Sequence, residues 1–144
     1  MSNMKMGEMD KDYETLKIDK VGIVNSTTGA VVLKDEKAEM VMSGFSPEVV
    51  GFISNFLEDR REDPPTIYRL VEQICEENEI FLVRVKIYET GGIFRANLYF
   101  TEKNDMVFRN FRASDAIALA TYYNIPILVR KSLLKKMNPE DAHS

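Results

Sequence analysis

Two alternating segments joined by a pair of glycines constrain the fold of this chain more than any other feature. Residues 81–87 and 94–100 alternate apolar and polar side chains, and a Gly-Gly pair stands at 91–92. A period of two is typical of half-buried strands, and glycines supply the positive φ angles of a tight turn. We predict an antiparallel hairpin in which the odd-numbered apolar residues of the first strand and the even-numbered ones of the second share a buried face. Arg84 and Lys86 are then expected on the other side.

Short apolar runs separated by turn residues predict further strands. Three strands in a meander are expected between residues 15 and 43. Two more short strands are expected at 106–111 and 126–129, and residues 132–137 are expected to form a last helical turn or two.

Three segments have the apolar spacing of helices. The first begins at Ser46-Pro47-Glu48, where Ser is a good N-cap, Pro suits the first helical position and an acid suits the first turn. The second follows Pro64-Pro65, is capped by Thr66, and carries one apolar stripe expected to face the core: Ile67, Leu70, Val71, Ile74 and Cys75. The third begins at Ser114-Asp115, either of which is expected to cap it, and ends at Asn124.

Length and composition are those of one globular domain. The chain has 144 residues, of which 44% are hydrophobic. Together with the predicted elements this indicates a single-domain α+β fold with a mostly antiparallel sheet and three main helices. We expect the domain to span residues 13–137, with flexible tails at 1–12 and 138–144.

The single cysteine, Cys75, cannot form an internal disulfide, and we interpret it as an inert core residue. No apolar run is long enough to cross a membrane, and residues 1–14 lack the apolar core of a secretory signal. A reducing cytoplasm is therefore expected.

The net charge is -4. Nucleic-acid affinity comes mostly from Lys and Arg, so this balance lowers the expectation of nucleic-acid binding without excluding a local patch. We interpret the short basic pair Arg60-Arg61 as a solvated face or a helix end.

Histidine is nearly absent. The only one, His143, stands in the C-terminal tail, which excludes a Ser-His-Asp triad, a Cys-His pair or a His-rich metal site inside the fold. What remains is carboxylates with Mg²⁺ or Mn²⁺, or a carboxylate and an arginine working without a metal.

The segment 111–120 is the most unusual stretch. Arg112, just ahead of Asp115, can form a bidentate pair with it. One interpretation is a fixed helix start, and the other is a phosphate-binding or catalytic pair.

These residues also carry a resemblance to the bifunctional nuclease domain family. The family's hallmark is an Arg-Pro-Ser-Asp-Ala-Ile-Ala-Leu-Ala run followed by a Pro-Ile strand. Arg112, the run 114–120 and Pro126-Ile127 match it, while Ala113 replaces the proline. The Phe-x-Ala-x-Leu of 94–98 and Glu48, early in the first helix, are similar to weaker family features. The resemblance covers about residues 13–137.

The resemblance implies a small α+β domain with a curved, mixed or mostly antiparallel sheet, a homodimer, and an association with RNase and DNase activity. One departure stands at the second helix, where the family usually shows Pro-Arg-Pro-x-Thr-His-Asp. Pro64 and Thr66 survive, but Asp63, Ile67 and Tyr68 stand in place of its Arg, His and Asp.

Two hypotheses follow. In the first the chain is a nuclease: Arg112 holds the phosphate, Asp115 and Glu48 act as acid, base or metal ligands, and Ser114 donates a hydrogen bond, with Thr66 as a further substrate-binding residue. In the second the fold is a non-enzymatic module that binds itself, another protein or a small ligand. Acidic charge and the absent His-Asp pair favour weak or no hydrolysis. We also expect Arg112→Ala to destabilise the fold more than it alters any activity.

Overall fold

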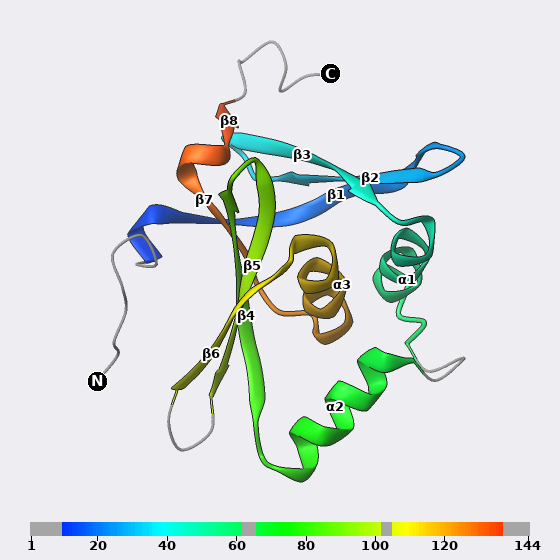
Figure 1. Ribbon diagram of the computed structural model, residues 1–144, viewed down its shortest axis with the longest axis vertical. Coiled ribbons are helices and arrows are strands. Elements are labelled where there is room, and N and C mark those ends of the chain that lie inside the picture. The colour runs from blue at the N-terminus through cyan, green and yellow to red at the C-terminus, as the bar shows by residue number, and fades with distance from the viewer. Residues whose placement is uncertain (1–9, 62–65, 102–104, 137–144) are drawn as a thin grey trace.

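An eight-stranded mixed sheet with three helices forms the fold (Figure 1). The computed structural model describes residues 10–61, 66–101 and 105–136. The strand order is β6-β5-β4-β7-β1-β2-β3-β8, and the predicted α+β class with a mostly antiparallel sheet is confirmed. The strands are β1 (Tyr13–Asn25), β2 (Thr28–Lys34), β3 (Ala38–Phe45), β4 (Phe81–Thr90), β5 (Ile93–Thr101), β6 (Asp105–Arg112), β7 (Ile127–Arg130) and β8 (Lys135–Lys136). The helices are α1 (Pro47–Leu57), α2 (Ile67–Glu77) and α3 (Ala113–Tyr123), with short 3-10 turns η1 (Asp10–Asp12) and η2 (Lys131–Leu133).

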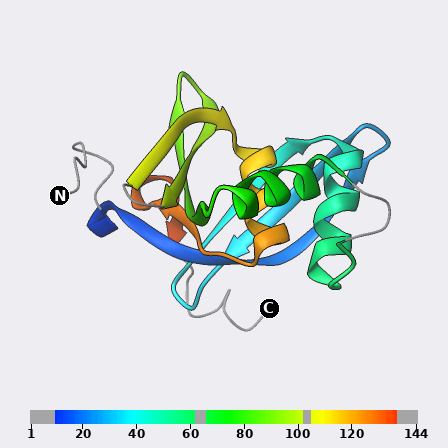
Figure 2. The ribbon, with the colours of Figure 1, turned by 90° about the horizontal axis from the view of Figure 1, so that it is seen from below.

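The sheet bends where β1 meets β7, and the helices lie on the inner side of the bend (Figures 1 and 2). β4 and β7 are parallel, and every other pairing is antiparallel. The main core lies between the helices and this inner face, and its fully buried members include Val31, Ile53, Val85, Ile117 and Val129. None of the described helices is long and apolar enough to cross a membrane.

The predicted start of α1 and end of α3 are confirmed. Ser46 is the N-cap of α1, and its side chain accepts a hydrogen bond from the Val49 backbone N–H at 3.2 Å. Pro47 opens the helix, where its missing N–H costs nothing. Asn124 ends α3 in the left-handed conformation, with φ 59°, which Asn tolerates better than most residues.

The predicted hairpin is confirmed, and its facing pattern holds for most of the apolar residues but fails at Phe81 and Lys86. β4 and β5 pair around Gly91 and Gly92, both at positive φ, and Val85 and Ile87 lie on the core side as expected. An irregularity between Leu82 and Arg84 shifts the phase, so Leu82 is buried. Phe81 is exposed instead.

Lys86 is fully buried, although the alternating sequence pattern predicts that it is exposed to solvent. Its ammonium lies 5.0 Å from the centre of the Tyr13 ring and 4.8 Å from that of Tyr99. Aromatic faces attract a cation, so the rings stabilise the charge that burial would penalise. Tyr13 comes from β1, far away in sequence, and no local pattern could indicate it.

Two further predictions are wrong. The α2 stripe does not face the core as a whole, because Ile67, Leu70 and Ile74 are exposed while Tyr68 and Cys75 are buried. Of the helical turns expected at 132–137, the described residues form only the 3-10 turn η2, and the chain then continues as β8, which pairs with β3. Pro64-Pro65, His143 and nearly all of the expected tails lie outside the described residues.

Candidate functional site

The helices α1 and α3 run side by side in the same direction, so their starts meet at one end of the pair and their C-termini at the other. Both axes point along the line of sight in Figure 1. Phe56 and Tyr122, each near the C-terminus of its helix, pack edge to face with ring centres 5.1 Å apart. A hollow lies at each end, one lined by residues just before α1 and at the start of α3, the other by the last residues of both helices.

The hollow at the helix starts, here called the start groove, has a volume of about 420 Å³. Three chain segments line it: 42–45 at the end of β3, 92–95 at the start of β5, and 112–114 at the junction of β6 and α3. It therefore contains two of the predicted site residues, Arg112 and Ser114.

Two arginines face each other across the strands that border the start groove. Arg95 of β5 is the register partner of Arg112 of β6, and both line the groove. Like charges directly opposite on neighbouring strands repel each other. Arg95 has no ion pair or hydrogen bond from its side chain within the described part of the chain. An anion between the two side chains would relieve this repulsion.

The predicted pair between Arg112 and Asp115 is present. Arg112 Nε donates to Asp115 Oδ2 at 3.0 Å and Nη2 donates to Oδ1 at 3.2 Å. The hydrogen bond and charge of Asp115 raise the pKa of Arg112. The side chains are 65% and 49% exposed, so the pair lies at the surface. The physical reason to expect a destabilised Arg112→Ala protein therefore disappears, because exposed pairs contribute little to stability.

Neither Ser114 nor Asp115 caps α3, contrary to the prediction. Arg112 occupies the N-cap position, and its side chain makes no capping hydrogen bond to the first turn within the described part of the chain. Those N–H groups lack partners within the helix and carry the positive end of its dipole. The start of α3 therefore offers donors to an anion, next to two guanidinium groups.

Glu48, Arg112 and Asp115 act together on Tyr68, a residue that the sequence did not suggest as functional. Burial, then the charges of Asp115 and Glu48, raise the pKa of Tyr68 to about 12, against the opposing effect of Arg112. Glu48 and Asp115 stand in the first turns of α1 and α3, whereas the Tyr68 ring packs against Phe52 and Phe56 of α1. At neutral pH this phenol keeps its proton and can donate it in a hydrogen bond.

Thr66 does not belong to the start groove. It is the N-cap residue of α2 by position, but its side chain makes no capping bond, and its hydroxyl is buried without a hydrogen-bond partner. Among the described residues, no three His, Cys, Asp or Glu side chains come together to hold a metal ion.

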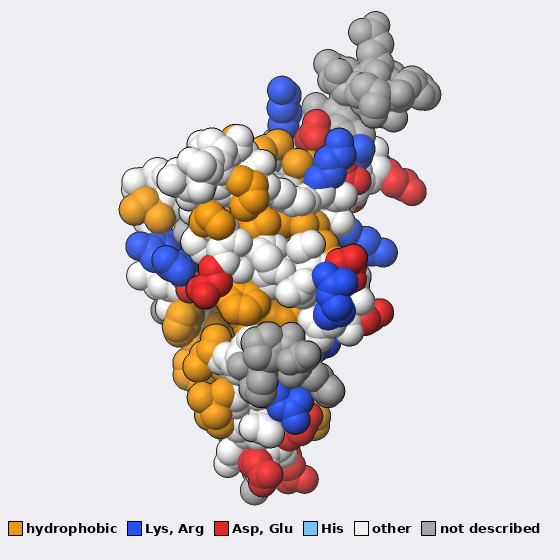
Figure 3. Space-filling model, turned by 90° about the vertical axis from the view of Figure 1, so that its right-hand side faces the viewer, with side chains coloured by type: hydrophobic (Ala, Val, Ile, Leu, Met, Phe, Trp, Pro, Cys, Tyr) orange, Lys and Arg blue, Asp and Glu red, His pale blue; other side chains and the backbone are white. Residues whose placement is uncertain are grey.

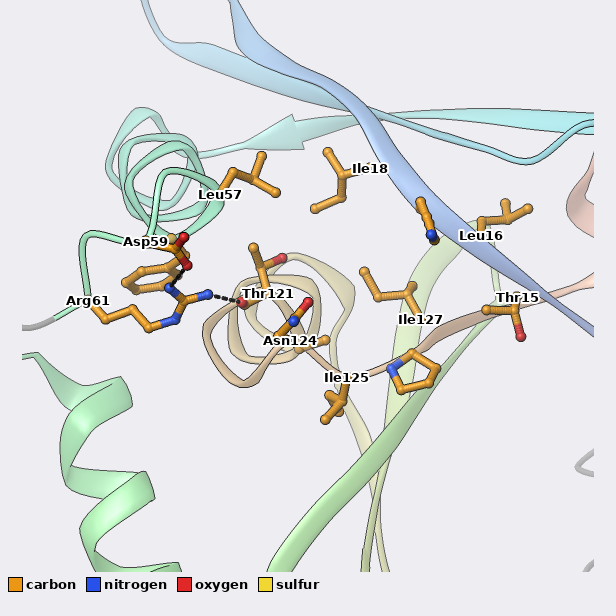
Figure 4. Close-up of a pocket in the computed structure, with 14 residues that line it drawn as sticks. Thr15, Leu16, Ile18, Leu57, Asp59, Arg61, Thr121, Asn124, Ile125 and Ile127 are labelled. Carbon is orange, nitrogen blue, oxygen red and sulfur yellow. Dashed lines mark hydrogen bonds and ion pairs between the residues drawn. The ribbon is translucent and has the colours of Figure 1, made fainter.

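The hollow at the helix C-termini, here called the end pocket, has a volume of about 560 Å³ (Figure 4). Its charged centre is Arg61, which points toward α3 from the segment after α1. Arg61 Nε donates to the Tyr122 carbonyl at 2.7 Å, Nη2 donates to the Thr121 carbonyl at 3.4 Å, and Nη1 pairs with Asp59 at 2.6 Å. The interpretation of this arginine as a helix-end residue is confirmed. Its hydrogen bonds go to the protein itself, and apolar side chains such as Leu57 and Ile127 form much of the wall.

A comparison with protein-family models identifies the family. The family model described as bifunctional nuclease domain matches residues 31–141, more than half of the chain. The chain belongs to the bifunctional nuclease domain family. No curated protein matches it.

In this family member, the substituted position Ala113 is the first residue of α3. Proline suits that position, so the family's proline and the alanine found here are both compatible with a helix start. The substitutions Ile67 and Tyr68 fall in the first turn of α2, where Ile67 is exposed and Tyr68 packs against Phe52 and Phe56 of α1. Arg95 was missed because strand register brings it beside Arg112, and this register cannot be read from local sequence.

Proposed function

We propose that this bifunctional nuclease domain binds the phosphodiester backbone of a nucleic acid in the start groove and hydrolyses it weakly or not at all. The opposed arginines Arg95 and Arg112 carry the proposal, because they repel each other until an anion lies between them. Uncapped N–H groups at the start of α3 and the Ser114 hydroxyl add donors. Family membership supports a nucleic acid as the source of the phosphate.

The acid and base groups around the groove support weak hydrolysis. A general base must accept a proton near neutral pH, and Tyr68, with a pKa of about 12, does not. Asp115 already accepts two hydrogen bonds from Arg112. A well-placed acid or base contributes about 10²- to 10⁴-fold to a rate, so a site without them has little turnover.

Binding is tested by fluorescence anisotropy with labelled single-stranded RNA and DNA over a series of salt concentrations. Arg95→Gln and Arg112→Gln are expected to weaken binding several-fold, and each should reduce the salt slope by about 0.7 for a single strand. Lys20→Gln is the matched control, because it removes one exposed positive charge from β1. Equal losses of affinity in all three variants would show that only net charge matters and would contradict binding in the start groove.

Hydrolysis is tested on the same oligonucleotides, with and without Mg²⁺ or Mn²⁺. We expect little or no cleavage. Robust cleavage that disappears in a folded Asp115→Asn protein would establish an active nuclease and overturn this half of the proposal. Cleavage that survives the substitution would be assigned to a contaminating enzyme or to another site.

We place this activity in the cytoplasm. The lone Cys75 is a buried free thiol, which a reducing compartment favours.

A further inference from the structure

A tyrosine stands beside the two opposed arginines of the start groove. Tyr88 of β4 is the register partner of Arg95, on the side away from Arg112. A row of tyrosine, arginine and arginine thus crosses three neighbouring strands. Ile87 and its partner Ala96 point into the core, so Tyr88 and Arg95 lie on the other face of the sheet, away from the helices (Figures 1 and 2). The arginine proposed to hold a phosphate therefore has an aromatic ring as its neighbour.

Hydrogen bonds hold the Tyr88 side chain across β5. Its hydroxyl donates to Asn110 Oδ1 at 3.4 Å, and Asn110 lies on β6, two strands away from β4. The Asn110 backbone N–H in turn donates to Asn97 Oδ1 of β5 at 3.1 Å. Asn110 has a positive φ of 68°, and such backbone conformations are concentrated at binding and catalytic sites. Because Tyr88 is only partly buried, this fixed position leaves part of its ring open to a ligand.

The face of the sheet that carries Tyr88 favours an anionic ligand. By the alternation of the strands, its residues within 84–90 and 93–99 include Arg84, Lys86 and Arg95 but no Asp or Glu. On the side of the molecule seen in Figure 3, by contrast, acidic side chains lie beside basic ones. Local positive charge attracts the phosphates of a nucleic acid. A strand bound at Arg95 is therefore expected to continue over Tyr88 rather than toward the side of mixed charge.

We propose that Tyr88 stacks on a base of the bound nucleic acid, so that the protein selects single strands over duplexes. The inference rests on the proposed phosphate binding by Arg95 and Arg112. Neighbouring strands lie about 4.8 Å apart, so the Tyr88 ring and the Arg95 guanidinium are within reach of one nucleotide. Stacking on an aromatic ring tolerates any sequence, because every base has a flat face. In a duplex the neighbouring base pairs cover that face, and the ring has no base to stack on.

Fluorescence anisotropy on the full chain tests the stacking with a labelled single strand and with the duplex of the same sequence. In Tyr88→Leu, the affinity for the single strand should fall at least about 5-fold, as for one lost stacked base, while the affinity for the duplex stays unchanged. The salt slope should also stay unchanged, because no charge is removed, whereas Arg95→Gln should reduce it. Tyr88→Phe keeps the ring and should keep the preference for the single strand.

Phe81→Leu is the matched control, since Phe81 is a 61% exposed aromatic residue at the other end of the same strand, and it should bind like the wild type. An abasic oligonucleotide, which keeps the phosphates but has no bases, tests the unaltered protein and should bind at least about 5-fold more weakly than the normal single strand. Equal affinity for the two, or undiminished single-strand binding by a folded Tyr88→Leu protein, would overturn the stacking but leave phosphate binding in the start groove. No binding of any of these oligonucleotides would overturn both.

Discussion

Arginines lie at both ends of the α1–α3 pair, but their side chains have different partners. In the end pocket, Arg61 donates to two backbone carbonyls of α3 and pairs with Asp59. In the start groove, Arg95 has no side-chain partner in the described residues, and Arg112 is held only by an exposed carboxylate. An arginine that binds its own backbone stabilises the fold, whereas one without a partner remains available to a ligand. On the proposed function, the end pocket stabilises the fold and the start groove binds the ligand.

The largest expected effect is the loss of stability in Arg61→Ala. Removing the guanidinium leaves two carbonyls at the C-terminus of α3 without their charged donor, and such bonds contribute roughly 1.5–3 kcal/mol each at most. We expect the free energy of unfolding, measured by urea titration, to fall by about 2 kcal/mol. Arg60→Ala is the control, because the exposed Arg60 bonds only to Asn55 and Glu58 and should change stability by less than about 1 kcal/mol. Equal losses of unfolding free energy in the two variants would contradict the stabilising role assigned to Arg61.

The second effect appears only at alkaline pH. The pKa of Tyr68 is raised from 10.0 to about 12 in the folded protein. A raised pKa means that the stability this group contributes is fully present below pH 10 and is lost as the pH rises toward 12. Two pKa units correspond to about 2.7 kcal/mol at most. Tyr68→Phe should therefore show a smaller loss of stability between pH 10 and 12 than the wild type, measured by urea titration at each pH. If stability fell equally with pH in the two proteins, this result would contradict the raised pKa of the buried Tyr68 phenol.

The third effect concerns binding rather than folding. In Arg112→Ala, we expect affinity for a single-stranded oligonucleotide to fall about 5- to 10-fold, as for one lost charged contact of roughly 1–1.4 kcal/mol. Unfolding free energy should change by less than about 0.5 kcal/mol, because the pair with Asp115 is exposed. A clear drop in melting temperature with unchanged binding would return Arg112 to a purely structural role and remove the contrast between the ends.

The smallest expected effect is a gain in stability from Ala113→Pro. Residue 113 is the first residue of α3, and Arg112 before it has φ -63° and ψ 133°, which proline permits in its predecessor. A proline there fixes φ and so reduces the conformational entropy of the unfolded chain. This should stabilise the fold by about 0.4–1 kcal/mol. Thermal unfolding checks it. A loss of stability would mean that the buried site of Ala113 has no room for the ring.

How far the sequence predicts this molecule depends on the distance between the residues involved. The hairpin around Gly91 and Gly92, the Ser46 cap and the Arg112–Asp115 pair were predictable, because their partners lie within a few residues. Burial of Lys86 was not, since it requires Tyr13 from a strand that comes close only in the fold. The outward stripe of α2 has the same periodicity as an inward one, so spacing alone cannot tell which face meets the core.

The site shows the same limit. Arg112, Ser114 and Asp115 could be named from a resemblance carried by a continuous motif, and Glu48 from a weaker family feature early in the first helix. Arg95 could not, because its meeting with Arg112 depends on the register of β5 and β6. Thr66 was named from its position at a helix start and proved to lie outside the start groove.

The pairing of β1 with β7 has a consequence for folding during synthesis. Residues 13–16 of β1 form strand pairs with residues 127–130 of β7. β4 pairs with the same short strand on its other side. On the ribosome, the β1–β3 meander and the β4–β6 strands can each form from local contacts, but the strand that joins them follows both in the chain. We expect the two halves of the sheet to remain unlinked until residues 127–130 have been synthesised.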